Sequence, residues 1–182
     1  MDHTRSIYLA LAAILLLSGA AVVASLFIPF DVAQDNTVQV RGEGGALLRQ
    51  GKQQPVTMEP EQDITLEAGD SFVLEANDAA TVRFFNEGWA VIEGPAEFVL
   101  RESHRHATAT GHLTGNNADY VLKIAQKAGT ARYNFERADP AYDDMAITIE
   151  LPNGNYVPQA PCWEVTITVD GTARTENIPC DF

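Results

Sequence analysis

The histidines that could bind a metal gather at His104-Arg105-His106, with His112 six positions beyond His106. Residues 104, 106 and 112 share one parity, so a β-strand would place the three imidazoles on one face, as a surface zinc site requires. Two histidines about 7 Å apart on one strand, with no Cys, Asp or Glu in phase nearby, make a poor zinc site. We therefore expect solvated strand histidines and predict no metal site.

Acidic residues form two groups, and neither has the spacing of a calcium loop, which needs Asp-x-Asp-x-Asp-Gly and a distal Glu. The groups are Glu59, Glu61 and Asp63, and Asp139, Asp143 and Asp144. A glycosidase needs two opposed carboxylates, and the sequence does not show which acids pair in space. The sequence also lacks a Gly-x-Ser-x-Gly motif, a phosphate-binding loop, a Cys-x-x-Cys-His haem motif and a redox Cys-x-x-Cys. It therefore predicts a protein without catalytic residues and without a cofactor.

The two cysteines, Cys162 and Cys180, suit an oxidising compartment. Side chains after Cys162 alternate between apolar and polar up to Val169, and Asp170-Gly171 then marks a hairpin turn. With a three-residue loop at 170–172, Cys162 faces Cys180 across the two strands, within the separation that a disulfide requires. A two-residue loop would place Cys162 opposite Pro179 instead, so the pairing includes one bulge. We predict a Cys162–Cys180 disulfide.

Short strand signals separated by turn residues recur beyond position 36, and no amphipathic helical stretch lies among them. Most aromatic residues fall inside these strands, where core packing is expected, and a solvent-facing subset would suit a partner or a glycan. A turn is expected at Glu93-Gly94-Pro95. The pattern predicts an all-β sandwich or roll of about ten short strands. The predicted strands are 37–41, 64–66, 71–75, 80–85, 89–92, 97–101, 106–112, 120–125, 130–135, 145–151 and the two strands of the final hairpin.

A turn at Leu66-Glu67-Ala68-Gly69-Asp70 is followed by an alternating strand, by residues 80–88 ending in Asn-Glu-Gly, and by residues 90–100 containing Glu-Gly-Pro. Over Val38 to Leu100 this succession resembles the FecR-like domain family. The resemblance implies an exported, β-rich domain. The best-known members are single-pass regulators that relay a signal from an outer-membrane receptor to a cytoplasmic sigma factor. Such regulators need a longer cytoplasmic segment than residues 1–6, so the resemblance supports the exported fold more than a signalling role.

An apolar N-terminal run precedes this domain, since residues 7–30 contain no charge. As a helix the run would span roughly 36 Å, against a hydrocarbon core of about 30 Å. A cleaved signal peptide is the alternative, with Val22-Val23-Ala24 as its cleavage site, but the apolar run continues to Phe30. Arg5 precedes the run and the next basic residue is Arg41, so the positive-inside rule places the N-terminus in the cytoplasm. We expect a cytoplasmic tail at 1–6, a transmembrane helix at 7–30, a linker at 31–36 and an extracytoplasmic FecR-like β domain at 37–182.

A formal net charge of -13 disfavours nucleic acid as a partner and suits a basic soluble protein. The leading hypothesis is a non-enzymatic, single-pass accessory subunit of a larger membrane complex in the inner membrane, such as a respiratory or photosynthetic electron-transfer assembly. Such a subunit would contact lipid and other subunits through its helix, and other proteins through its β domain. The alternatives are a FecR-type transmembrane signalling component and an anchored cell-wall or glycan-binding module.

Overall fold

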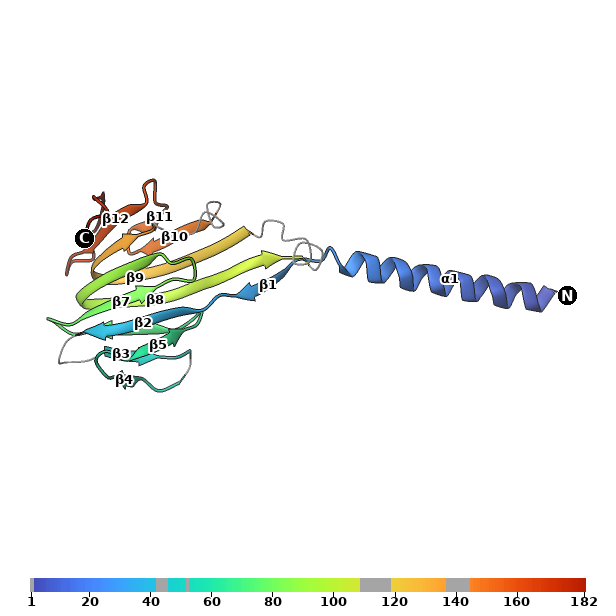
Figure 1. Cartoon of the computed structure of the whole chain (residues 1–182), viewed down its shortest axis with the longest axis horizontal. Helices are drawn as coiled ribbons and strands as arrows, with labels where there is room; N and C mark the ends of the chain where they lie inside the picture. Colours follow the sequence, from blue (N-terminus) through green and yellow to red (C-terminus); the bar gives the residue numbers. More distant parts are fainter. Residues whose placement is uncertain (1, 42–45, 52, 109–118, 137–144) are drawn as a thin grey trace. The chain divides into compact units, whose positions relative to one another are not determined.

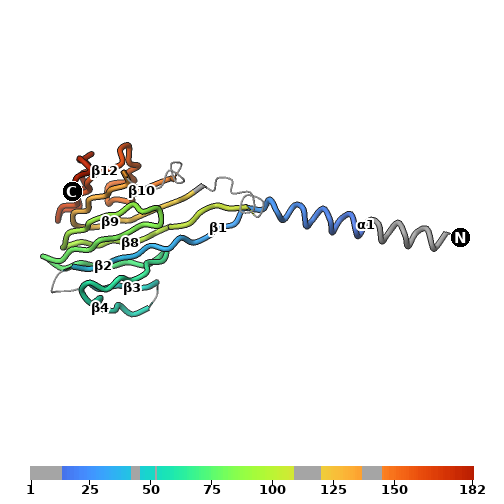
Figure 2. Tube along the Cα trace, in the orientation of Figure 1, coloured from blue at the N-terminus to red at the C-terminus, as the bar shows by residue number. Residues whose placement is uncertain are grey.

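The computed structural model describes residues 2–41, 46–51, 53–108, 119–136 and 145–182 (Figure 1). The chain divides into two compact units, one of Met1–Val32 with His106–Ala118 and one of Ala33–Arg105 with Asp119–Phe182. The helical segment precedes all the strands along the chain (Figure 2). The all-β class predicted for the residues after the apolar run is confirmed.

In the first unit, helix α1 (Asp2–Ser25) begins five residues before the predicted Ile7 and ends at Ser25 rather than at the predicted Phe30. Pro29 accounts for the early end, because proline disfavours helical geometry at the residue before it and has no N–H to donate. Strand β1 (Phe30–Ala33) then occupies much of the segment predicted as a linker at 31–36.

The described side chains of α1, from Ile14 onward, are exposed. Leu15, Leu16 and Leu17 keep 71%, 74% and 72% of their surface accessible. Among the described residues, no helix combines the length and the apolar character that crossing a membrane requires.

The remaining strands alternate buried and exposed residues, as expected for sheets with one face on a core. They are β2 (Asn36–Arg41), β3 (Ala46–Arg49), β4 (Val56–Met58), β5 (Asp63–Leu66), β6 (Ser71–Leu74), β7 (Ala79–Arg83), β8 (Trp89–Ala107), β9 (Asp119–Asn134), β10 (Ala146–Leu151), β11 (Gly154–Tyr156), β12 (Cys162–Ile167) and β13 (Ala173–Asn177). The sequence analysis missed β3, β4 and β11.

Strand β8 connects two groups of antiparallel strands. Residues 89–93 pair with β7, and the ladder continues through β2 to β5. Residues 96–99 pair with β6, and that ladder continues through β3 to β4. The change of partner falls at Gly94-Pro95, so the turn predicted at 93–95 is wrong and one long strand replaces the predicted short ones.

Strand β9 lies next to β8 and also has two partners on its other side. Its residues 121–125 pair in parallel with β10, and residues 129–134 pair antiparallel with β12. The predicted strands 120–125 and 130–135 are therefore two halves of one strand. Between the halves, Gly129 has a φ of +82°, a backbone conformation that favours glycine.

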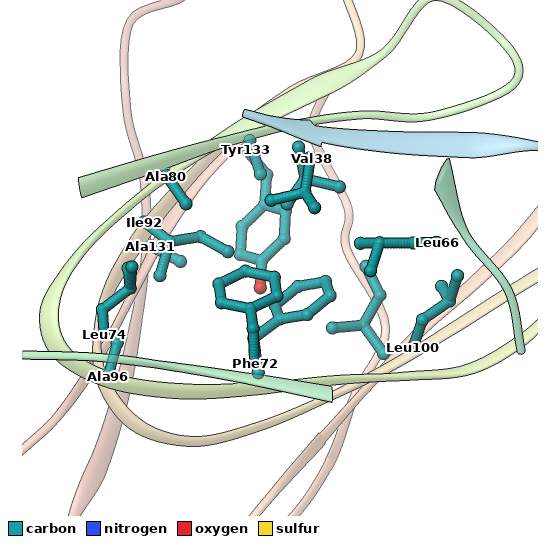
Figure 3. Close-up of a cluster of buried hydrophobic side chains, with 14 of the residues drawn as sticks. Val38, Leu66, Phe72, Leu74, Ala80, Ile92, Ala96, Leu100, Ala131 and Tyr133 are labelled. Atoms are coloured by element: carbon teal, nitrogen blue, oxygen red, sulfur yellow. The ribbon is translucent and has the colours of Figure 1, made fainter. Parts of the chain in front are cut away.

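The core lies between the two groups of strands. Figure 3 shows Val38, Ile92 and Ala131 facing Phe72 and Leu74 across the interior. Phe72 stacks on Phe98 with ring centroids 5.0 Å apart, and Tyr133 stacks on Trp163 at 5.2 Å. These rings bury large apolar areas and dominate the packing energy of a domain of this size.

A buried polar network holds β9 at Gly129, where the positive φ bends the strand away from a regular extended path. The Gln126 side-chain amide donates to the carbonyl oxygens of Gly129 (2.9 Å) and Val165 (3.2 Å), and its Oε1 accepts the Tyr133 hydroxyl (3.1 Å). Burial raises the pKa of Tyr133 far above its usual value, so the phenol stays a donor. Because every polar group of Gln126 has a partner, the network fixes the geometry of the bend at low cost.

The predicted disulfide is confirmed: Cys162 and Cys180 are bonded, with Cα atoms 5.4 Å apart. The predicted register is wrong by two residues, because Ile167 rather than Val169 faces Ala173. The three-residue loop is 169–171, closed by the Thr168 N–H donating to the Thr172 carbonyl at 3.0 Å. Gly171 takes the positive-φ position of this loop (φ 81°), which the predicted loop would have given to Thr172, a β-branched residue that disfavours it.

Ion pairs cross the outer surface of β8, β9, β10 and β12. Glu150 accepts from Lys123 Nζ at 3.0 Å and from Arg101 Nε at 3.1 Å. Glu164 accepts from Arg132 Nε at 2.8 Å, and Lys127 pairs with Glu97. Four basic residues of this acidic chain are thus paired within the sheet surface.

In the Glu150→Gln variant, the free energy of unfolding should decrease less than in the parent chain as the pH is lowered. The hydrogen bond from Lys123, with smaller contributions from both cations, lowers the pKa of Glu150 below its unfolded value of 4.5. Its stabilising contribution is therefore present above pH 4.5 and disappears as the pH falls through the lower folded pKa. We expect an effect below about 1 kcal/mol, since the side chains are partly exposed. Urea unfolding between pH 7 and pH 3 measures this pH dependence of the free energy of unfolding. As a control, Glu176→Gln at an exposed site on β13 should leave the pH dependence unchanged.

Candidate binding groove

A hollow of the second unit lies on the outer surface of β2, β7 and the start of β8, at the turn that joins β7 to β8. Its volume is about 760 Å³, within the range of ligand sites in proteins. It is lined by Arg41, Thr81, Arg83, Phe84, Phe85, Glu87, Trp89, Val91 and Phe182.

Strand alternation explains why the lining side chains of β2, β7 and β8 face outward. In β7, Ala80 and Val82 are buried in the core, so Thr81 and Arg83 point to the opposite face. Antiparallel register sets Trp89 opposite Arg83. The same alternation along β2 places Arg41 on this outer face, and the three strands together form the floor of the groove.

Hydrogen bonds hold the turn between β7 and β8. The Phe84 N–H donates to the Gly88 carbonyl at 2.8 Å, and buried Asn86 accepts the Gly88 N–H through Oδ1 at 3.2 Å. Glu87 has a φ of 66°, a conformation that is uncommon for a residue other than glycine. Residues held in such conformations concentrate at functional sites. The exposed Glu87 side chain is thereby presented at the end of the groove.

Two unpaired cations and several aromatic rings come together in the groove. Neither Arg41 nor Arg83 forms an ion pair with a carboxylate among the described residues. Trp89 is half-buried and packs against Phe182 with ring centroids 4.9 Å apart. Phe85 stacks on Tyr120 at 5.5 Å. Arginine and large aromatic residues are the types that dominate binding energy at protein interfaces.

The histidines predicted from the sequence lie elsewhere. His104 and His106 are both on β8, half-buried and exposed respectively, and His112 lies outside the described residues. Within the first unit, His106 Nδ1 lies 2.5 Å from Asp31 Oδ1. The sequence analysis missed this neighbour, because Asp31 and His106 are 75 residues apart in the chain.

The acidic groups do not meet in the groove. Glu59, Glu61 and Asp63 lie around β4 and β5, and Asp139, Asp143 and Asp144 fall outside the described residues. Among the described residues, Glu87 is the acidic side chain that lines the groove. The arrangement offers two guanidinium groups, a hydroxyl and aromatic surface, all of which can bind a ligand.

Most aromatic residues of the strands and their flanking turns fall into a buried group or a half-buried group. Phe84, Phe98, Tyr133, Phe135 and Trp163 are buried. Phe85, Trp89 and Tyr120 are half-buried, and they supply the partly solvent-facing subset that the sequence analysis had associated with a partner. No protein-family model, no curated protein and no solved structure matches this chain.

Proposed function

We propose that this chain is a non-enzymatic accessory subunit of a larger membrane protein complex, and that its β domain binds a partner protein through the groove formed by β2, β7 and β8. The observation that supports this most is the combination of Arg41, Arg83 and Trp89 in one hollow of about 760 Å³. Interfaces concentrate their energy in such arginine and aromatic anchors.

The N-terminal helix is the proposed membrane anchor. Its support is the charge-free run at residues 7–30 and the exposed leucines of α1. A helix that is apolar all round is typical of a lipid environment. Arg5 before the run favours a cytoplasmic N-terminus and an extracytoplasmic β domain at the inner membrane.

The charge supports the proposed setting of the complex. A surface on a chain of net charge -13 steers a basic soluble carrier toward the complex, as in respiratory or photosynthetic electron transfer. The resemblance of residues 38–100 to FecR-like domains is part of this proposal and concerns the exported domain.

Co-purification tests the proposal. The full chain, extracted from its native membrane in mild detergent, is expected to elute with other subunits at a mass well above that of one 19.8 kDa chain. Elution of the chain alone, at the mass of a single copy in every detergent used, would contradict the subunit assignment.

A further inference from the structure

We infer that the groove recognises an extended, acidic segment of the partner, in which two carboxylates four residues apart pair with Arg41 and Arg83. The inference rests on the proposed function and specifies the chemistry of the partner. Its starting point is that both guanidinium groups line the groove without an ion-pair partner among the described carboxylates.

The sheet register sets the spacing of the two arginines. Arg41 lies opposite Ala79 in the β2–β7 ladder, and Arg83 follows Ala79 by four residues along β7. At about 3.3 Å per residue, the two positions are roughly 13 Å apart along the strand direction. An extended partner segment covers that length in four residues, so carboxylates at positions i and i+4 match the two cations.

The floor between the arginines suits an apolar side chain. Thr81 and Val91 face each other across β7 and β8, midway between the levels of Arg41 and Arg83. Trp89 extends the apolar surface beside Arg83. The partner residue at i+2 is therefore expected to be aliphatic or aromatic.

Arginine is suited to this role because its planar guanidinium binds a carboxylate through two parallel hydrogen bonds. Four other cations of the second unit, Arg101, Lys123, Lys127 and Arg132, pair with neighbouring carboxylates of the sheet.

The acidity of the chain and of Glu87 limits what the groove accepts. A long polyanion would be repelled by a chain of net charge -13, whereas two carboxylates placed on two arginines are each locally compensated. Glu87 lies at the turn end of the groove and opposes a third carboxylate there. Glu87→Gln should therefore tighten binding of an acidic segment by about threefold.

The test uses a fluorescein-labelled peptide, Glu-Ser-Phe-Ser-Glu, and the full chain in detergent, with fluorescence anisotropy as the readout. We expect it to bind at least about tenfold more tightly than Lys-Ser-Phe-Ser-Lys, or than a peptide of the same composition with adjacent glutamates. Equal affinity for the three peptides would overturn the inference.

Matched arginine variants locate the binding. Arg41→Gln and Arg83→Gln should each weaken the peptide by about tenfold, the loss of one charge-assisted contact. Arg174→Gln replaces an exposed arginine on β13, outside the groove, and should change the affinity by less than about twofold. An equal loss in Arg174→Gln would also overturn the inference. If the peptides fail while the chain still co-purifies with other subunits, the acidic segment is refuted and the proposed function stands.

Discussion

Replacing Gly129 with alanine is expected to lower the free energy of unfolding by about 3 kcal/mol or more. Gly129 has a φ of +82°, and a Cβ built there would lie 2.6 Å from the Pro95 carbonyl oxygen and 2.6 Å from the Ala96 Cβ. Both atoms belong to β8, so neither can move aside without disturbing the strand that joins the two ladders. The Gln126 network on the same bend would be distorted as well.

Gly171→Ala is the matched control for this effect. Gly171 has nearly the same φ, +81°, but no atom lies within 4 Å of a Cβ built there. The Gly171→Ala variant should lose only about 1–2 kcal/mol of its free energy of unfolding, because a residue with a Cβ is held at a positive φ. Urea unfolding followed by near-ultraviolet circular dichroism measures both variants, and equal losses at the two positions would show that the approach of β9 to β8 contributes nothing.

Loss of the disulfide is expected to cost about 3 kcal/mol in the chain-entropy description, because Cys162 and Cys180 close a loop with a sequence separation of 18. The bond ties the segment after β13 to β12, and that segment includes Phe182, which packs on Trp89 in the groove. The double variant Cys162→Ser, Cys180→Ser should therefore lose stability and also expose Trp89 to quenchers.

Reduction supplies the control for the disulfide. Dithiothreitol should lower the stability of the parent chain by the same amount and leave the double serine variant unchanged. A parent chain whose denaturation midpoint does not move on full reduction would contradict the expected contribution.

Local patterns in the sequence predicted the features that depend on neighbouring residues. Alternation after Cys162 and the Asp170-Gly171 turn predicted the final hairpin, and with it the disulfide. The register was missed because loop closure depends on which residue takes the positive φ. Asp170 also contributes to the loop, since its carboxylate accepts from Thr168 and Thr172.

Features set by distant residues were not predictable in the same way. Glu93-Gly94-Pro95 has the composition of a turn, yet β8 continues through it because β7 and β6 supply ladder partners on either side. The groove combines β2 with β7 and β8, so Arg41 and Arg83 meet only through sheet pairing. The one local signal was their parity, which is opposite to that of the buried Val40 and Val82.

Position-specific photo-crosslinking in native membranes tests partner binding through the groove most directly. A crosslinking residue at Thr81, on the groove floor, is expected to form an adduct with one partner subunit. The same residue at Thr175, exposed on β13, should give little or none. The Thr81 adduct should decrease strongly when Arg83 is changed to Gln. No adduct at Thr81, or equal adducts at Thr81 and Thr175, would contradict binding of the partner in the groove.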